Sequence, residues 1–244
     1  MRNALLRRRR RADDDLAFLD PYLPDLALAI ITLGGDRFVL DGERIPYQDP
    51  ALEVEVTAVG QPVGGVRQVR GVGDPAVQVV EANRPVWGEE GLMLSAAGSG
   101  NRNLRANLQV PPGSSSLVAV GLAAASTGYL IDCRPAGANL IAGGNGGNFS
   151  IWNGSWSSSG ISMSGASRLA YSASGTDATL YVDEGSADVT FSAPSVDGPV
   201  SLFNHQNPGT GGNAFSGSCK AIIILNRSLT PAEIASLSAS LEAL

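Results

Sequence analysis

Short apolar runs separated by turn-forming residues set the strongest limit on how this chain can fold. Gly, Pro and Asn gather between the runs, as at residues 111–113, 143–147 and 153–154. Runs this short suit strands, because helices need about ten residues or more. The pattern predicts strands at residues 52–59, 77–80, 92–95, 116–124, 129–133, 139–142, 149–152, 168–172, 178–182, 188–191, 200–203 and 218–225. Many short strands joined by tight turns indicate an all-β fold, a two-sheet antiparallel jelly-roll sandwich.

The length of the chain agrees with one such domain preceded by a short arm. The chain has 244 residues, and sandwiches often run to about 200–250 residues as a single unit. We therefore divide it into an N-terminal anchoring arm, residues 1–38, and a β-sandwich, residues 39–244. An arm this short cannot form a core of its own, so its apolar side chains must pack on something else.

The arm begins with a basic segment. The first 11 residues hold six of the 17 basic residues and none of the 23 acidic ones. The acidic remainder argues against nucleic-acid binding by the main domain, since phosphate contacts need Lys and Arg. The basic segment suits a solvated tail, a contact with packaged nucleic acid, or an acidic surface on a partner protein, and we favour the partner. Its clustered residues are Arg7, Arg8, Arg9, Arg10 and Arg11.

The rest of the arm has two apolar pieces. Three aspartates at residues 13–15 can cap a short helix through residues 16–19, which Pro21 ends. A second apolar run, residues 26–33, suits a helix or, because several of its residues are β-branched, a strand. We favour docking of these side chains on a partner chain, with docking on the chain's own domain as the alternative. The predicted anchors are Leu16, Phe18 and Leu19.

One helix has a strong local signal, at the C-terminus. Thr230 and Glu233 form a capping box, with Pro231 at the first helical position. Apolar residues then recur at helical spacing, so one face of this helix should pack on the sandwich or on a neighbour. The residues of that stripe are Ile234, Leu237, Leu241 and Leu244.

Two segments in the C-terminal third carry a family resemblance. Residues 178–185 read Ala-Thr-Leu-Tyr-Val-Asp-Glu-Gly, and residues 215–233 contain a strand-like run, the turn Arg-Ser-Leu-Thr and the capped helix. The first resembles the hairpin, and the second the closing strand, turn and helix, of laminin-G-like, concanavalin A-like lectin domains. The resemblance covers about residues 39–244 and implies the same sandwich fold.

Segments further upstream look like part of phage structural proteins. Residues 47–49, 57–64 and 83–85 resemble a segment that precedes the laminin-G-like portion of those proteins. Residues 70–75 depart from the pattern, because the family has an Asn-rich turn there. The resemblance implies a virion protein of a phage or phage-like particle, assembled in the bacterial host cytoplasm and forming a homo-oligomer. A role in the head or in a tail spike or fibre rests on analogy of fold alone.

Catalytic constellations are not evident in the sequence. Glycoside hydrolases need two carboxylates flanking one bond, but Glu53 and Glu55 suit the solvent face of an edge strand. Asp183 and Glu184 are adjacent and suit a turn. The only histidine, His205, is not accompanied by a nucleophile elbow. We therefore expect a protein that is not an enzyme.

The metal-ligating residues are equally sparse. One histidine and two separated cysteines, Cys133 and Cys219, exclude an ordinary zinc site, and we expect both thiols to be free and buried. Laminin-G-like domains can hold Ca²⁺ through Asp, Asn and backbone oxygens, which makes Asp177, Asp183 and Asp197 candidates. Loop aspartates more often only form turns, so we expect no cofactor and leave calcium open.

Sugar binding is the chemistry that the residues suit best. It needs exposed aromatic faces together with planar amides, and both gather in two stretches of the chain. The alternative is that the tryptophan at position 152 belongs to the core and the asparagines form turns. The candidate glycan-binding residues are Asn145, Asn148, Trp152, Asn153 and Trp156, with Asn204 and His205 from a second loop.

Two functions remain open at this point. The first is a virion decoration protein that is anchored by its arm and presents a lectin-like sandwich to host-surface polysaccharide. Deleting residues 1–38 is then expected to leave a soluble domain that no longer joins particles. The second is a free lectin-like or polysaccharide-processing protein. An export signal and paired acids would favour it, but the arginine run lacks a following apolar region and residues 26–33 are too short to cross a bilayer.

Overall fold

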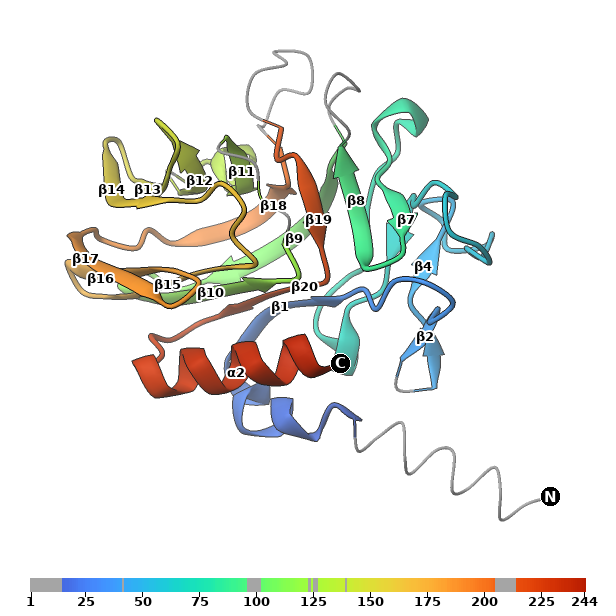
Figure 1. The fold of residues 1–244 in the computed structure, drawn as a ribbon, viewed down its shortest axis with the longest axis horizontal. Helices are drawn as coiled ribbons and strands as arrows, with labels where there is room; N and C mark the ends of the chain where they lie inside the picture. Colours follow the sequence, from blue (N-terminus) through green and yellow to red (C-terminus); the bar gives the residue numbers. More distant parts are fainter. Residues whose placement is uncertain are drawn as a thin grey trace.

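The predicted sandwich is confirmed by a computed structural model, which describes residues 15–40, 42–95, 102–122, 124, 127–138, 140–204 and 214–244. A nine-stranded sheet and a six-stranded sheet, both antiparallel, form the two layers (Figure 1). Helix α2 (Pro231–Ala243) lies against the far side of the six-stranded sheet. We call the side of each sheet that faces away from the other sheet its outer face.

The nine-stranded sheet has the order β14-β13-β12-β11-β18-β9-β6-β5-β4. Its strands, in that order, are Trp156–Ser162, Asn148–Trp152, Ile141–Asn145, Gly128–Asp132, Val196–Leu202, Leu104–Val110, Ala76–Val77, Gly65–Val66 and Pro46–Tyr47. The six-stranded sheet has the order β1-β20-β10-β15-β16-β17. Its strands are Leu26–Ile31, Ala221–Leu225, Ser114–Val120, Arg168–Ser174, Asp177–Val182 and Gly185–Thr190.

Smaller elements complete the described part of the chain. A three-stranded sheet, in the order β19-β8-β7, and the hairpin β2–β3 lie to the right of the sandwich in Figure 1. Their strands are Gly217–Cys219, Gly91–Ser95, Val86–Gly88, Val39–Leu40 and Glu43–Arg44. Four short 3₁₀ helices are η1 (Ala17–Asp25), η2 (Val69–Gly71), η3 (Glu81–Asn83) and η4 (Arg134–Ala136).

The core lies between the two large sheets. Along β9, buried residues alternate with exposed ones, because successive side chains of a strand point to opposite faces. All five residues of β20 are buried instead, since this strand has the core on one side and α2 on the other. Each fully buried aliphatic side chain contributes about 1.5–3 kcal/mol.

The N-terminal segment belongs to this core. Residues 26–31 form strand β1, which resolves the open choice between helix and strand, and β1 pairs with β20 in the six-stranded sheet. Leu16 and Leu19 are fully buried, and Phe18 packs partly buried against the same core. The three predicted anchors therefore lie on the chain's own sandwich. Arg7 to Arg11 lie outside the described residues.

The first predicted helix differs in kind from the expectation. Residues 17–25 form the 3₁₀ helix η1, which continues through Pro21 and Pro24. A 3₁₀ helix tolerates these prolines better than an α-helix, because it does not need the same i to i−4 hydrogen bonds. Pro21 therefore does not end the helix as predicted.

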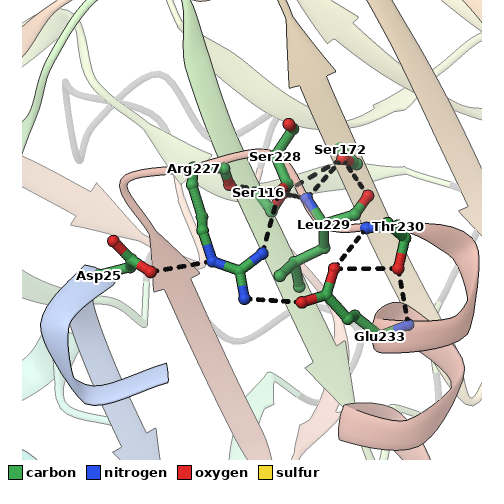
Figure 2. A network of polar contacts seen from close by, with 8 residues as sticks. All are labelled: Asp25, Ser116, Ser172, Arg227, Ser228, Leu229, Thr230 and Glu233. Carbon is green, nitrogen blue, oxygen red and sulfur yellow. Dashed lines mark hydrogen bonds and ion pairs between the residues drawn. The ribbon is translucent and has the colours of Figure 1, made fainter. Parts of the chain in front are cut away.

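A polar network fastens the two chain ends onto the outer face of the six-stranded sheet (Figure 2). The Arg227 guanidinium donates to Asp25 of the N-terminal segment at 2.9 Å and to Glu233 of α2 at 2.7 Å. The buried hydroxyls of Ser116 and Ser172 each accept from the Leu229 N–H at 2.9 Å. The loop before α2 is therefore bonded to β10 and β15, and Arg227 links both ends of the chain.

Two local predictions are confirmed at the level of single bonds. Thr230 and Glu233 form the capping box, in which each side chain accepts from the backbone N–H of the other residue. Val182 pairs with Gly185 across the turn Asp183–Glu184, so the family-like hairpin is β16–β17.

The strand prediction at residues 52–59 is wrong, and of the predicted strand at residues 77–80 only Val77 lies in a strand, β6. Residues 52–59 form turns and a single bridge in place of a strand. The Asp49 carboxylate accepts from the backbone N–H groups of Ala51 at 2.8 Å, Glu53 at 3.1 Å and Val54 at 2.6 Å. These bonds coil the chain around the carboxylate and compete with an extended conformation.

Candidate functional site

The candidate site lies on the outer face of the nine-stranded sheet, over β11 to β14. Strand pairing places one row of side chains directly opposite one another, and such residues share a face of the sheet. The neighbouring row is buried in the core, so the first row points away from the core, although Ser201, Asp132 and Ile141 within it are also buried. The outward row is Arg105, Ser201, Asp132, Ile141, Trp152 and Trp156. The core row is Leu104, Leu202, Ile131, Ala142 and Ile151.

Two tryptophans form the edge of this face. Trp152 and Trp156 are paired directly across the β13–β14 hairpin, and both remain partly exposed. The Trp156 ring reaches inward over the sheet to Tyr129 of β11, with 5.9 Å between the ring centroids. Gly143 of β12 pairs with Tyr129, and a Cβ atom there would come within 2.4 Å of the Gly128 carbonyl oxygen and 3.1 Å of the Tyr129 ring. The glycine therefore allows the backbone of β11 and the Tyr129 ring to lie close to β12.

An ion pair between Arg134 and Asp132 lies beside Trp152 in the same row. Arg134 of η4 binds the buried Asp132 carboxylate with two bonds, Nε–Oδ1 at 3.0 Å and Nη2–Oδ2 at 2.6 Å. The guanidinium also stacks over the Trp152 ring, 5.7 Å from its centroid. The hydrogen bonds that Arg134 donates to Asp132 raise the pKa of Arg134. The pair is thus held in a fixed orientation, and the Arg134 side chain remains 23% exposed.

Tyr129 completes the group. Burial raises the pKa of its phenol, with the Arg134 charge acting in the opposite direction and Asp132 in the same one. The phenol stays protonated at neutral pH and can donate or accept a hydrogen bond. We call the five residues Tyr129, Asp132, Arg134, Trp152 and Trp156 the aromatic cluster. It offers ring faces, a hydroxyl and a fixed guanidinium within one partly exposed area.

The structure divides the predicted glycan-binding residues. Trp152 and Trp156 lie side by side, but Asn145 and Asn148 pair at the opposite end of β13, about 13 Å from Trp152 along the strand. Asn153 lies in the hairpin turn, and its side-chain amide donates to the Ser192 carbonyl. Asn145 and Asn148 therefore lie apart from the two tryptophans, although all four belong to the same stretch of the sequence.

Of the two candidate residues in the second predicted loop, the structure describes Asn204. Asn204 is buried just after β18, with 2 % of its surface exposed. His205 lies outside the described residues. The site therefore depends on residues of β11 to β14 and η4.

The structure shows where the three aspartates that were candidates for calcium binding lie. The Asp183 carboxylate accepts from the Ser167 N–H and hydroxyl and from the Arg168 N–H, each at 2.9 Å, so it fixes a turn. Asp177 lies at the other end of β16, and Asp197 accepts from Gln109 at 3.3 Å. Among the described residues, no group of three or more His, Cys, Asp or Glu side chains could hold a metal ion.

Sequence reasoning missed three members of the aromatic cluster. Tyr129, Asp132 and Arg134 precede Trp152 by about twenty residues, and they meet it only through the pairing of β11, β12 and β13. The signal that could have found Arg134 is its spacing of two from Asp132, which suits a local ion pair at the end of a strand.

The comparisons with known proteins bear on the fold. No protein-family model matches the sequence, and a search of curated proteins finds no match. Within the described part of the chain, no helix has the length and apolar character needed to cross a membrane.

Solved structures resemble the chain at low sequence identity. An arabinofuranosidase complexed with arabinofuranosyl-α-1,2-xylobiose matches 94% of this chain and 64% of its own, with a TM-score of 0.60 and 10% identity. A GH54 α-L-arabinofuranosidase soaked with a cyclic sulfate inhibitor matches 89% and 62%, with a TM-score of 0.58 and 11% identity. A Trypanosoma rangeli sialidase in complex with 2,3-difluorosialic acid matches 98% and 39%, with a TM-score of 0.51 and 14% identity. The chain thus spans less than two thirds of these proteins, and what it shares with them is a β-sandwich fold.

Proposed function

We propose that this chain is a carbohydrate-binding β-sandwich whose binding surface is the aromatic cluster. The observation that carries the proposal is the pairing of Trp152 and Trp156 on an outward face, beside Tyr129 and Arg134. Sugar rings stack their apolar C–H faces on aromatic rings, while hydroxyls bond to fixed polar groups. The sandwich proteins that resemble the chain are named as glycosidases with sugar or inhibitor ligands, which supports the same substrate class.

We also propose that the protein binds glycans without cleaving them. Hydrolysis needs an acid and a second carboxylate at a common bond. The carboxylate of the aromatic cluster belongs to Asp132, which is fully buried and already holds Arg134 through both oxygens. The release of reducing ends from a bound polysaccharide would contradict this part of the proposal.

A role on a virion extends the proposal. Residues 47–49, 57–64 and 83–85 resemble phage structural proteins, which supports a decoration protein of a head or tail and a homo-oligomer. Many copies on one particle would convert weak sugar contacts into adhesion, since a millimolar site alone is worth only about −4 kcal/mol. Detection of the protein in purified particles, with loss of its incorporation on deletion of residues 1–14, tests the basic segment as the anchor.

Titration of the full chain with neutral oligosaccharides of arabinose and xylose tests the binding proposal. Trp152→Ala and Trp156→Ala are expected to weaken binding at least tenfold, while Trp152→Phe keeps a ring and retains part of it. Val79→Ala, at a residue that is 70% exposed and outside the cluster, is the control for any effect of surface change. Equal affinities for all four variants would contradict the proposal.

A further inference from the structure

A polar groove of about 580 Å³ lies at the edge of β9, away from the aromatic cluster. Strand β6 pairs with β9 only at Val77 and Arg105. Beyond that pair the loop at residues 72–74 lies beside β9, and the start of β1 forms the far wall. The side chains that give the groove its chemistry are Asp74, Asn107, Gln109, Asp197 and Asn226.

Two amide–carboxylate pairs line this groove. Asn107 donates to Asp74 at 3.4 Å, and Gln109 donates to Asp197 at 3.3 Å. Both distances are long for an N–H···O bond, so the amide and carboxylate groups of each pair keep capacity for further hydrogen bonds. Each pair therefore presents a donor and acceptors side by side, and these match neighbouring hydroxyl groups of a ligand.

Asn226 supplies an independent reason to expect a ligand. Its Oδ1 atom is buried and has no hydrogen-bond partner among the described residues, although its backbone N–H donates to Asp25. A buried acceptor without a partner is costly, and most native structures avoid it. Because Asn226 lines the groove, a ligand hydroxyl that reaches this atom would satisfy it. Asn226 directly follows β20, so it is held in place by the sheet.

Charge defines which ligands the groove would accept. Two carboxylates line it, and the described residues of its wall include no Lys or Arg. An anionic sugar would meet repulsion there, whereas a neutral, hydroxyl-rich sugar would not. Those described wall residues also include no aromatic ring, so recognition would rest on hydrogen bonds in place of stacking.

The groove side chains from β9 and β18 share the outer face of the nine-stranded sheet with the aromatic cluster. Asp197 lies four residues before Ser201 on β18, and Ser201 stands opposite Asp132. Residues separated by an even number point to the same side of a strand, so Asp197 shares the outer face with Trp152. The span is about 13 Å along β18 and about 14 Å across three strand spacings, or roughly 20 Å in all.

We propose that this groove is a second sugar-binding subsite, specific for neutral saccharides and able to bind one end of a chain whose other part stacks on the aromatic cluster. The inference rests on the proposed function, because it assumes the same class of ligand. The residues of the groove are separate from those of the aromatic cluster. Binding of a longer neutral oligosaccharide then gains from both subsites, and binding of a monosaccharide does not.

The test compares neutral xylose and arabinose oligosaccharides of increasing length, by calorimetry, on the full chain and on groove variants. Asp197→Asn with Asn107→Ala is expected to remove the gain in affinity with length, with a loss of roughly threefold to tenfold for each lost bond. Asn226→Leu removes the unpartnered acceptor, so it should lose the same gain while thermal stability is unchanged or higher. The control is Asp177→Asn, in a groove on the outer face of the six-stranded sheet.

The outcomes separate the two proposals. If the groove variants bind long oligosaccharides as the unaltered chain does, while Trp152→Ala does not, the second subsite is refuted and the proposed function stands. If neither set of variants changes binding, both proposals fail. An equal loss with Asp177→Asn would also refute the subsite, because the effect would then follow surface charge in general.

Discussion

The two outer faces of this sandwich are built in opposite ways. The outer face of the six-stranded sheet is partly covered by the chain itself, since α2 lies over it and Ser116 and Ser172 bond the loop before α2 to β10 and β15 (Figures 1 and 2). The outer face of the nine-stranded sheet instead leaves Trp152 and Trp156 partly exposed. Hydrophobic surface that is not covered by the chain itself is available to a ligand. The covered face should therefore govern stability, and the open face binding.

Removal of the N-terminal segment should have the largest effect. Deleting residues 1–31 removes Leu16, Leu19 and all of β1, and their buried side chains contribute about 1.5–3 kcal/mol each. The sum is comparable to the whole stability of a typical domain, about 5–15 kcal/mol. We expect an insoluble or unfolded protein, which circular dichroism and solubility measure. This outcome replaces the sequence-based expectation that deleting residues 1–38 leaves a soluble domain.

A shorter deletion is the matched control for this prediction. Removing residues 1–14 leaves every described contact in place, so the melting temperature should change little. A soluble, cooperatively folded product of the longer deletion would contradict the role given to β1.

The open face contains one feature on which stability should also depend. Arg134→Ala leaves the buried Asp132 carboxylate without its two bonds, at a cost of about 2–4 kcal/mol. Arg134→Lys keeps the charge but not the two-bond geometry, so its stability should fall between that of the unaltered chain and that of Arg134→Ala. Chemical denaturation measures both. A loss below about 0.5 kcal/mol for Arg134→Ala would show that Asp132 does not depend on this partner.

The link between the chain ends should show a smaller and pH-dependent effect. Hydrogen bonds from Arg227 and from Thr230 lower the pKa of Glu233 to about 2 from the ordinary value of 4.5. A lowered pKa in the folded state means that this stabilisation is present above about pH 4.5 and is lost as the pH falls toward 2. The difference in melting temperature between the unaltered chain and Glu233→Gln should therefore shrink over that range. A difference that stays constant would contradict the assignment.

The tryptophan variants should have the smallest effect on stability. Trp152 is partly exposed and its neighbours do not depend on it for hydrogen bonds, so Trp152→Ala should cost about 1 kcal/mol or less. The same change is expected to abolish most glycan binding. A large loss of stability with unchanged binding would reverse the assignment of the two faces.

The sequence predicted what local signals encode. The capping box at Thr230 and the hairpin turn at Asp183 each depend on a few neighbouring residues, and both are present. Trp152 and Trp156 share a face because a short hairpin turn separates them. The strand alternation and turn residues were likewise enough for the sandwich class.

The sequence did not predict contacts between distant segments. The partner of β1 is β20, which follows it by about two hundred residues, so the arm could not be assigned to its own domain. Asn145 and Asn148 were grouped with Trp152 by nearness in sequence, but an intervening strand of extended backbone carries them apart. Tyr129 and Arg134 join the tryptophans only through the register of three strands.

The indole N–H signals give the most direct measurement of the central claim. The chain has three tryptophans, and Trp87 is fully buried with its indole N–H bonded to the Gly35 carbonyl, so it is an internal reference. On titration with a neutral oligosaccharide, the indole signals of Trp152 and Trp156 should shift in the nitrogen–proton spectrum while that of Trp87 stays in place. Saturable binding that leaves the Trp152 and Trp156 signals unmoved would contradict a binding surface on the open face.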